Sequence, residues 1–456
     1  TLLASDATWQ VAQDGPWHYS DIYMGESFDA TRQFRDFHPV AITMPDIRLD
    51  ARNSAPVRCV ETLTPRNITF HGAAVIVDFG QNLAGRERIT FHAPRGTRIV
   101  IRHGEMLQAD GTLYTANLRR ARAVSTVIAP GGKFTYEPEF TFYGFRYLEV
   151  SGVDKFEVTA RVLHSDLPLT GSIRCGNALI NRLAQNILWG QRGNFLDIPT
   201  DCPQRDERRG WLGDAQVFIP TALFNMHAAS FFRKWLDDVL TSRDAAGRYP
   251  FYTPNDRRAG RPDKFGASGW ADAGVICPHR LFLMYGDRTI LEKHAPAIYR
   301  WIDWQQSHSE AGLCRHACFR DWLNLDAPTS EELISTAYFA HGANLASDIA
   351  RTLNDRATAE RMQAHFELGK AAFRRHFLNR HGELAERTQC AAVMALKFHL
   401  LEGAEIPLAI AILVDDIVQQ RDCHLSTGFL GTPLLLHALS ENGQLPLAYW
   451  LLDQPT

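Results

Sequence analysis

Carboxylates, arginines and aromatic residues are concentrated in one short segment, residues 197–218 (DIPTDCPQRDERRGWLGDAQVF). Its candidate acid and base groups are the side chains of Asp201, Asp206, Glu207 and Asp214. Neighbouring arginines would keep a carboxylate ionised, whereas an apolar wall such as Trp211 would favour the protonated form of an acid that must donate a proton. The pattern fits a catalytic loop for acid–base chemistry, and it fits a structural loop closed by salt bridges equally well.

Before about residue 165, the apolar residues follow the spacing of strands. Phe134, Tyr136, Phe140 and Phe142 alternate with other residues, and Gly or Pro interrupts the chain at short intervals. Short alternating runs separated by such turns predict an antiparallel β-sandwich.

From about residue 166 the apolar spacing lengthens to that of helices. Among the expected helices are residues 331–354, 357–378, 389–401, 408–420, 432–439 and 445–452. Gly286 and Gly443 stand near expected helix ends, where a residue that tolerates the left-handed conformation is favoured. About nine short helices with incomplete apolar faces predict an all-α toroid of paired helices rather than a bundle.

Composition and charge exclude several classes of protein. The chain has 456 residues, a formal net charge of −3 and 45% hydrophobic residues, which argues against a disordered chain and against a nucleic-acid partner. No apolar run approaches the roughly 20 residues of a membrane span. The eight cysteines are scattered, so we expect reduced thiols in a cytoplasmic protein. Cys314 and Cys318 lack a second pair for a zinc site, and we expect no metal or cofactor.

The segment around Glu207 closely resembles the signature of the α-L-rhamnosidases of glycoside hydrolase family 78. Six further stretches resemble that family in the same order along the chain. They are residues 20–26 (SDIYMGE), 77–85 (VDFGQNLAG), 102–107 (RHGEML), 142–147 (FYGFRY), 269–273 (GWADA) and 425–433 (LSTGFLGTP). The resemblance spans essentially the whole chain, and its long signature is more specific than a short glycine motif.

This resemblance implies accessory β-sandwiches, an (α/α)6 barrel that holds the active site, and a C-terminal β-sandwich. We therefore expect residues 1–48 to be the tail of an N-terminal β-sandwich domain and a linker. Residues 49–165 are expected to form an accessory β-sandwich, and residues 166–456 the catalytic barrel. Thr1 and Thr456 are expected to be cut points, so that the barrel is truncated at its C-terminal end.

The resemblance also implies exo-acting hydrolysis of terminal α-L-rhamnosyl bonds with inversion, which requires an acid and a general base. By motif position, Glu207 is the expected general acid, and Asp201 and Asp214 are expected to bind sugar hydroxyls. The other expected substrate-binding residues are Asp206, Arg208, Trp211, Trp270, Asp272 and Trp322. The tryptophans would cover the apolar faces of a deoxy sugar. Asp272 and Asp321 could equally be caps of the backbone.

The family's general base, a glutamate in a W-E-R-like motif, has no counterpart in this sequence. We expect the base beyond residue 456, so that hydrolysis by this chain alone is impaired. Glu441 is not at the base position and is interpreted as a helix C-terminal residue. The expected partner is a glycoside or polysaccharide that carries terminal α-L-rhamnose. Two alternatives stay open: another (α/α)6-barrel glycosidase, and a carbohydrate-binding protein without catalysis.

Overall fold

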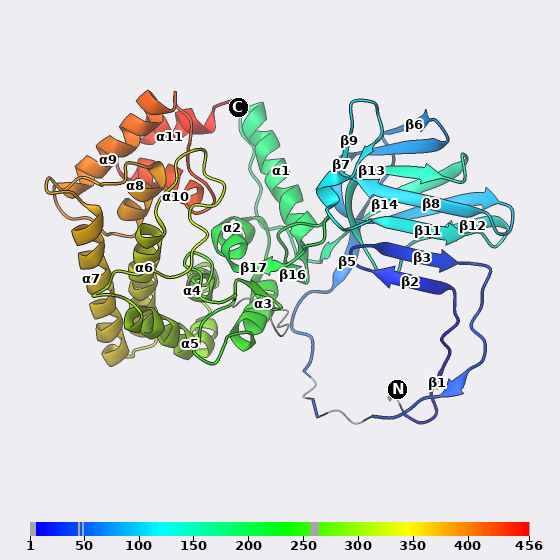
Figure 1. The fold of residues 1–456 in the computed structure, drawn as a ribbon, viewed down its shortest axis with the longest axis horizontal. Helices are drawn as coiled ribbons and strands as arrows, with labels where there is room; N and C mark the ends of the chain where they lie inside the picture. Colours follow the sequence, from blue (N-terminus) through cyan, green and yellow to red (C-terminus); the bar gives the residue numbers. More distant parts are fainter. Residues whose placement is uncertain (1–5, 44–45, 48–49, 256–263, 456) are drawn as a thin grey trace. The chain divides into compact units, whose positions relative to one another are not determined.

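The computed structural model describes residues 6–43, 46–47, 50–255 and 264–455. The chain folds into two compact units, coloured along the sequence in Figure 1. The sheet unit comprises the chain up to Asp166 together with Asn186–Arg208, and the helical unit comprises Leu167–Gln185 together with the chain from Arg209 onward. The expected change from strands to helices near residue 165 is confirmed, since β14 ends at Ser165 and α1 begins at Ala178.

A ten-stranded sheet forms the framework of the sheet unit. Its main path runs through β2 (Trp17–Asp21), β3 (Gly25–Asp29), β11 (Val124–Ile128), β8 (Arg98–Gly104), β13 (Tyr143–Ser151), β7 (Ala74–Ala93), β14 (Phe156–Ser165) and β5 (Val57–Leu63). Two further strands, β6 (Asn67–His71) and β12 (Gly132–Tyr136), also pair with β7. The pairing is antiparallel, as predicted, except that β3 and β11 are parallel. No short turn connects those two strands, so turn geometry does not set their relative direction.

The long strand β7 links two parts of the sheet because it changes partners along its length. It pairs with β13 up to Gly85 and with β14 from Gly85 onward. A Cβ atom at Gly85 would lie 2.0 Å from the backbone oxygen of Arg161. The close approach of the two strands therefore explains the glycine that ends the sequence motif 77–85.

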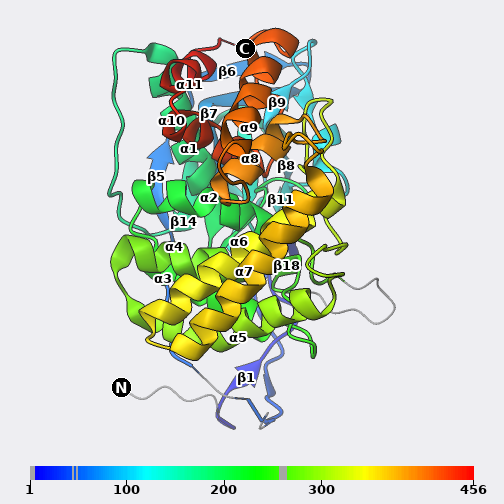
Figure 2. The same ribbon diagram turned by 90° about the vertical axis from the view of Figure 1, so that its left-hand side faces the viewer.

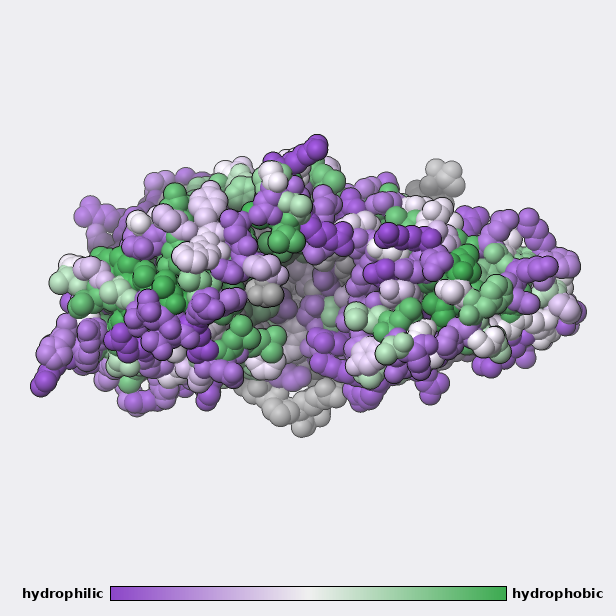
Figure 3. All heavy atoms as spheres, turned by 90° about the horizontal axis from the view of Figure 1, so that it is seen from above, coloured by the Kyte–Doolittle hydropathy of each residue, from purple (hydrophilic) through white to green (hydrophobic). Residues whose placement is uncertain are grey.

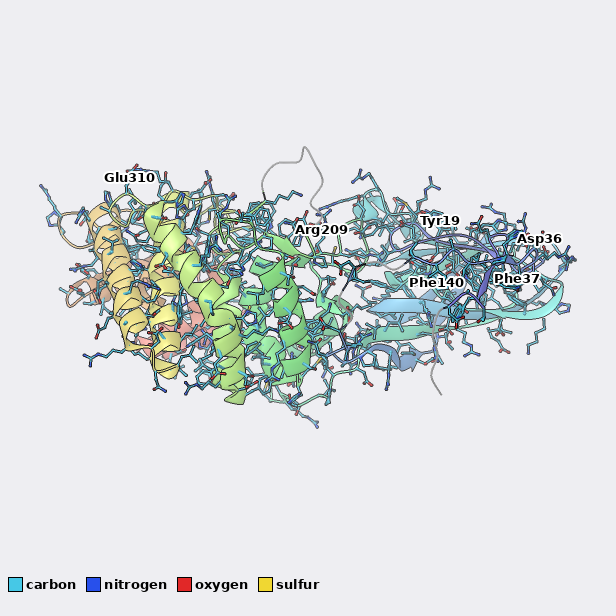
Figure 4. All side chains as sticks on the ribbon, turned by 90° about the horizontal axis from the view of Figure 1, so that it is seen from below. Tyr19, Asp36, Phe37, Phe140, Arg209 and Glu310 are labelled. Carbon is cyan, nitrogen blue, oxygen red and sulfur yellow. The ribbon has the colours of Figure 1, made fainter. Side chains whose placement is uncertain are left out.

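The N-terminal strands are part of the same sheet as the rest of this unit. The sequence analysis assigns residues 1–48 to a separate domain tail, whereas β3 pairs directly with β11. The short strands β1 (Gln10–Val11) and β4 (His38–Pro39) pair with each other. Trp17 in β2 packs edge-on against Phe140 at a ring distance of 5.6 Å, and Phe140 and Tyr19 are labelled in Figure 4. Because these contacts join residues that are far apart in the sequence, no local sequence pattern predicts which strand the N-terminal segment pairs with.

The interior of the sheet unit combines an apolar core with a buried contact between a glutamate and a histidine. Glu87 and His103 both have fully buried side chains, and His103 Nε2 lies 2.8 Å from Glu87 Oε2. The other imidazole nitrogen lies 2.8 Å from the carbonyl oxygen of Ala123, and the ring of Tyr143 stacks on the imidazole at 3.7 Å. A buried polar group that loses its hydrogen-bond partner costs about 1–3 kcal/mol, and more if it is charged, so each member of this pair depends on the other.

The rest of the described chain is dominated by helices. They are α1 (Ala178–Asn194), α2 (Leu212–Asn225), α3 (Ala229–Thr241), α4 (Ala273–Tyr285), α5 (Arg288–Ser307), α6 (Glu331–Thr352), α7 (Arg356–Phe377), α8 (Gln389–Lys397), α9 (Glu405–Asp415), α10 (Thr432–Glu441) and α11 (Leu445–Leu452). In the helical unit α2, α4, α6, α8 and α10 contact one another in succession, and each odd-numbered helix from α3 to α11 contacts an even-numbered one. The longest such pair, α6 and α7, runs side by side in Figure 2.

Side-chain caps and glycines set the helix ends. Ser330 accepts a hydrogen bond from the backbone N–H of Leu333 at the start of α6, and Thr388 accepts one from Ala391 at the start of α8. Gly286 ends α4 in the left-handed conformation, with φ at +68°. These features confirm the expected ends at those positions, because capping satisfies backbone groups that the helix leaves unpaired.

Three general observations concern the helices, the surface and the thiols. Among the described residues, no helix is both long and apolar enough to cross a bilayer. On the face seen from above, hydrophilic and hydrophobic residues intermingle (Figure 3). All eight cysteines are free thiols.

We predict that His103→Leu destabilises the sheet unit by about 3–5 kcal/mol, because it leaves the Glu87 carboxylate buried without its partner. The matched control is Asp166→Asn, which removes an ion pair with Arg58 whose side chains are 48% and 65% exposed. The control is expected to cost at most about 1 kcal/mol. Urea denaturation of the whole chain measures both, and equal losses would show that the buried pair contributes no more than the exposed one.

Candidate active site

The candidate site residues divide between the two compact units. Asp201, Asp206, Glu207 and Arg208 belong to the sheet unit. Trp211, Asp214, Trp270, Asp272 and Trp322 belong to the helical unit.

In the sheet unit, arginines surround the carboxylates of the signature loop. The Arg205 guanidinium lies 3.1 Å from Glu207 Oε2 and 3.5 Å from Asp201 Oδ2. Arg119 approaches the same Glu207 oxygen at 2.9 Å, and the Glu207 side chain is 17% exposed. Asp206 pairs with Arg120 at 2.9 Å. The structure thus brings Asp201 and Glu207 together through Arg205, and it directs Asp206 to a different arginine.

The ligand atoms of Asp201, Cys202 and Glu207 all lie within 4.8 Å of one another, close enough to hold a metal ion. The chemistry of these donors does not favour one. Burial raises the pKa of the Cys202 thiol to about 12, so the thiolate that binds metals is disfavoured. Arg205 also already contacts both carboxylates of the group. Arg205, rather than a metal ion, therefore supplies the positive charge beside these two carboxylates.

Arg208 is buried and holds the backbone of the loop rather than facing open space. Its Nη1 donates to the carbonyl oxygens of Ile22 at 2.7 Å and Phe142 at 2.8 Å. Its guanidinium also lies over the rings of Tyr23 and Phe142 at 5.5 and 4.8 Å. Burial lowers the pKa of Arg208 to about 10, which leaves the side chain charged at neutral pH. These contacts indicate a positioning residue; its assignment as a sugar ligand stays a prediction.

The neighbouring sequence motifs meet at this loop. Tyr23, in the motif 20–26, donates its hydroxyl to the carbonyl oxygen of Glu207 at 2.8 Å. Phe142, in the motif 142–147, accepts from Arg208. Two motifs that are distant in sequence therefore contact the chain at the expected acid and at the residue after it.

In the helical unit, the three candidate tryptophans gather around one residue that the sequence analysis missed. Phe319 lies 4.7 Å from Trp270, 6.0 Å from Trp211 and 6.4 Å from Trp322, measured between ring centroids. Trp270 is buried and also stacks on Phe429 at 6.0 Å, whereas Trp322 is 51% exposed. A lone phenylalanine in a loop has no periodic pattern, and only its position three residues before Trp322 could have drawn attention to it.

Local backbone structure explains how two of these residues are placed. The strand β17 (Gly210–Trp211) pairs with β18 (Tyr252–Thr253), and α2 begins at the next residue, so that Asp214 lies in its first turn. A Cβ atom at Gly213 would lie 2.4 Å from the ring of Trp270. The glycine of the W-L-G-D sequence therefore makes room for the indole.

Asp272 and Asp321 are fully buried and accept hydrogen bonds from the protein itself. Asp272 accepts from the backbone N–H of Gly269 at 2.8 Å and from Trp301 Nε1 at 2.9 Å, and burial raises its pKa. Asp321 accepts from the N–H groups of Gly428, Leu430 and Gly431 at 2.7–3.0 Å. For both residues these contacts favour the backbone cap over the ligand, and Asp321 ties the loop before α10 to the loop that carries Trp322.

Glu441 is the last residue of α10, as the sequence analysis expected, and it pairs with Lys397 at 2.6 Å. Residues 256–263 lie outside the described residues.

Comparisons with known proteins identify the family. The model for the bacterial alpha-L-rhamnosidase six-hairpin glycosidase domain matches residues 168–456, and that for the bacterial alpha-L-rhamnosidase concanavalin-like domain matches residues 68–165. An alpha-L-rhamnosidase of Streptomyces avermitilis is 39% identical over the whole chain, which covers 45% of that protein. One of Formosa agariphila is 36% identical over the whole chain, which covers 51% of it.

The likeness extends to a solved structure. The crystal structure of a Streptomyces avermitilis alpha-L-rhamnosidase complexed with L-rhamnose matches 99% of this chain and 45% of that one, with a TM-score of 0.94 and 38% identity. The chain spans about half the length of the curated relatives it matches. Because the glycosidase-domain model alone matches more than half of the chain, the chain belongs to the bacterial α-L-rhamnosidases of glycoside hydrolase family 78.

Proposed function

We propose that this chain is part of an exo-acting α-L-rhamnosidase that removes terminal α-L-rhamnosyl residues from glycosides or polysaccharides with inversion. Membership of the family and the rhamnose complex of the Streptomyces avermitilis relative support the substrate class. The alternation of even- and odd-numbered helices supports an (α/α)6 barrel. The division at residue 165 remains our proposal for the start of the catalytic barrel, and the pairing of β3 with β11 argues against a separate domain before residue 48. A cytoplasmic location is proposed on the free thiols alone.

The observation that carries this proposal is the convergence of Trp211, Trp270 and Trp322 on Phe319. Rhamnose is a 6-deoxy sugar, so it presents a methyl group and C–H faces that flat aromatic rings can cover. The ring of Trp322 is 51% exposed, so this part of the cluster is open to solvent. An apolar surface for a deoxy sugar accounts for that exposure.

Glu207 is our proposed general acid, and Asp201 and Asp214 are our proposed ligands of sugar hydroxyls. The signature loop holds the Glu207 carboxylate between Arg119 and Arg205. Both arginines contact Oε2, so donation of a proton from Oε1 to the glycosidic oxygen would require neither contact to break. Asp206, already paired with Arg120, is the weaker candidate for a sugar ligand.

We propose that the general base is supplied from outside this chain, because the family's W-E-R-like motif has no counterpart in the sequence. Another (α/α)6-barrel glycosidase would share the aromatic cluster but release a different sugar. A carbohydrate-binding protein would bind rhamnose and release none.

We predict that Glu207→Gln, made in the longer protein that contains this chain, lowers kcat for an aryl α-L-rhamnoside by about 10²–10⁴-fold. The amide keeps the shape of the side chain but cannot donate the proton, so the Kd for L-rhamnose should change by no more than a few fold. The matched control is Glu310→Gln, whose side chain is 76% exposed and is labelled in Figure 4. Steady-state kinetics and calorimetric titration measure both quantities. An unchanged kcat in Glu207→Gln would remove Glu207 as the acid.

We further predict that the longer protein releases β-L-rhamnose from the α-linked substrate as its first product. Direct attack of an activated water inverts the anomeric centre, and time-resolved proton NMR distinguishes the two anomers before they equilibrate.

The same time course run with the 456-residue chain should be slower by about 10²-fold or more, since general base catalysis is lost. Initial α-L-rhamnose would contradict inversion, and equal rates would place the base inside this chain.

A further inference from the structure

A pocket in the sheet unit borders the signature loop and shares one residue, Asp201, with the proposed hydrolysis. It has a volume of about 360 Å³ and lies among β7, the C-terminal half of α1 and the start of the signature loop. The residues that matter for its chemistry are Asn82, Glu105, Trp189, Gly193, Asp201 and Gln204. All of them belong to the sheet unit. The volume lies within the range of roughly 300–1,000 Å³ that is typical of small-molecule sites. We call this space the α1–β7 pocket.

The polar groups on its wall form a connected set. Asn82 Nδ2 donates to Glu105 Oε1 at 2.9 Å, and Gln204 also hydrogen-bonds the Glu105 carboxylate. Burial raises the pKa of Glu105. The other end of the Gln204 amide, Oε1, is buried and has no hydrogen-bond partner among the residues that the structure describes. An unsatisfied buried acceptor costs about 1–3 kcal/mol. Because this oxygen has less than 1 Å² of exposed surface, a ligand hydroxyl in the pocket would bond to it only after the amide turns.

The helix α1 leaves room for such a ligand. Gly190 and Gly193 both line the pocket, and a Cβ atom at either position would meet nothing within 4 Å. Neither has the positive φ that demands glycine. Glycine inside a helix costs about 1 kcal/mol relative to alanine. Two glycines that the backbone does not require, both facing open space, keep the pocket free of side chains.

We propose that the α1–β7 pocket binds a neutral sugar unit, in addition to the one that the proposed hydrolysis would cleave. Amides and carboxylates together offer both donors and acceptors, which is what sugar hydroxyls need. Trp189 provides an aromatic surface for C–H groups. The described lining includes the carboxylates of Glu105 and Asp201 and no Lys or Arg, which disfavours a phosphate or a uronic acid. Asp201 and Gln204 place the ligand against the loop that carries Glu207.

The test uses the whole chain labelled with 5-fluorotryptophan and followed by ¹⁹F NMR. The chain has ten tryptophans, and Trp189→Phe identifies the resonance of Trp189. The titrants are L-rhamnose, D-glucose, D-galactose and D-glucuronate. We expect the Trp189 resonance to shift saturably with at least one neutral sugar and not with D-glucuronate.

Gly193→Leu locates the response, because leucine would extend into the pocket while its better helix propensity preserves α1. It should weaken the Trp189 titration at least tenfold without lowering the melting temperature. The matched control is Gly176→Leu, an exposed position where a Cβ atom also meets nothing within 4 Å. That variant should titrate like the unmodified chain. The proposal is overturned if no neutral sugar moves the Trp189 resonance, if D-glucuronate alone moves it, or if Gly193→Leu leaves the titration unchanged.

Discussion

The buried guanidinium of Arg208 is the contact on which the arrangement of the signature loop depends. Taking a charge out of water costs several kcal/mol unless its hydrogen bonds are satisfied. Here Nη1 is satisfied by the carbonyl oxygens of Ile22 and Phe142, and the same arginine also reaches back to carbonyl oxygens of Gln204 and Arg205. A loop that moved away from the strands would have to expose or orphan these groups. The backbone at the expected acid, one residue before Arg208, is therefore fixed by these contacts in addition to the ion pairs of the Glu207 side chain.

In the helical unit, buried aspartate side chains hold loops by hydrogen bonds to the main chain, as Arg208 does in the sheet unit. Asp321 gathers three backbone N–H groups from the loop before α10, and charge-assisted bonds of this kind are about twice as strong as neutral ones. Asp272 accepts one backbone N–H, that of Gly269, in the turn that carries Trp270, and it also accepts from the side chain of Trp301. The aromatic residues proposed to meet the sugar stand beside these buried carboxylates. In both units, the charged residues that look most available for chemistry in the sequence are partly occupied in holding loops.

The sequence predicts the parts of this structure that follow from local patterns. Apolar spacing locates the helices α6 to α11 to within a few residues at most of their ends. The predicted change from strands to helices after residue 165 is also confirmed. Long-range contacts are different. Neither the parallel pairing of β3 with β11 nor the place of residues 186–208 in the sheet unit has a local signal. Phe319 and Arg208 also make their contacts with residues that are distant in the chain. A sequence motif can therefore point to such a residue but cannot predict its contacts.

The most direct test of this account is hydrogen–deuterium exchange of the signature loop in an Arg208→Lys variant. Lysine keeps the charge but cannot reproduce the planar array of donors that Arg208 uses. We predict at least tenfold faster exchange for amides in residues 201–208, with no such change in Arg58→Lys, whose side chain is 65% exposed. Unchanged exchange in Arg208→Lys would contradict the claim that the buried guanidinium holds the loop.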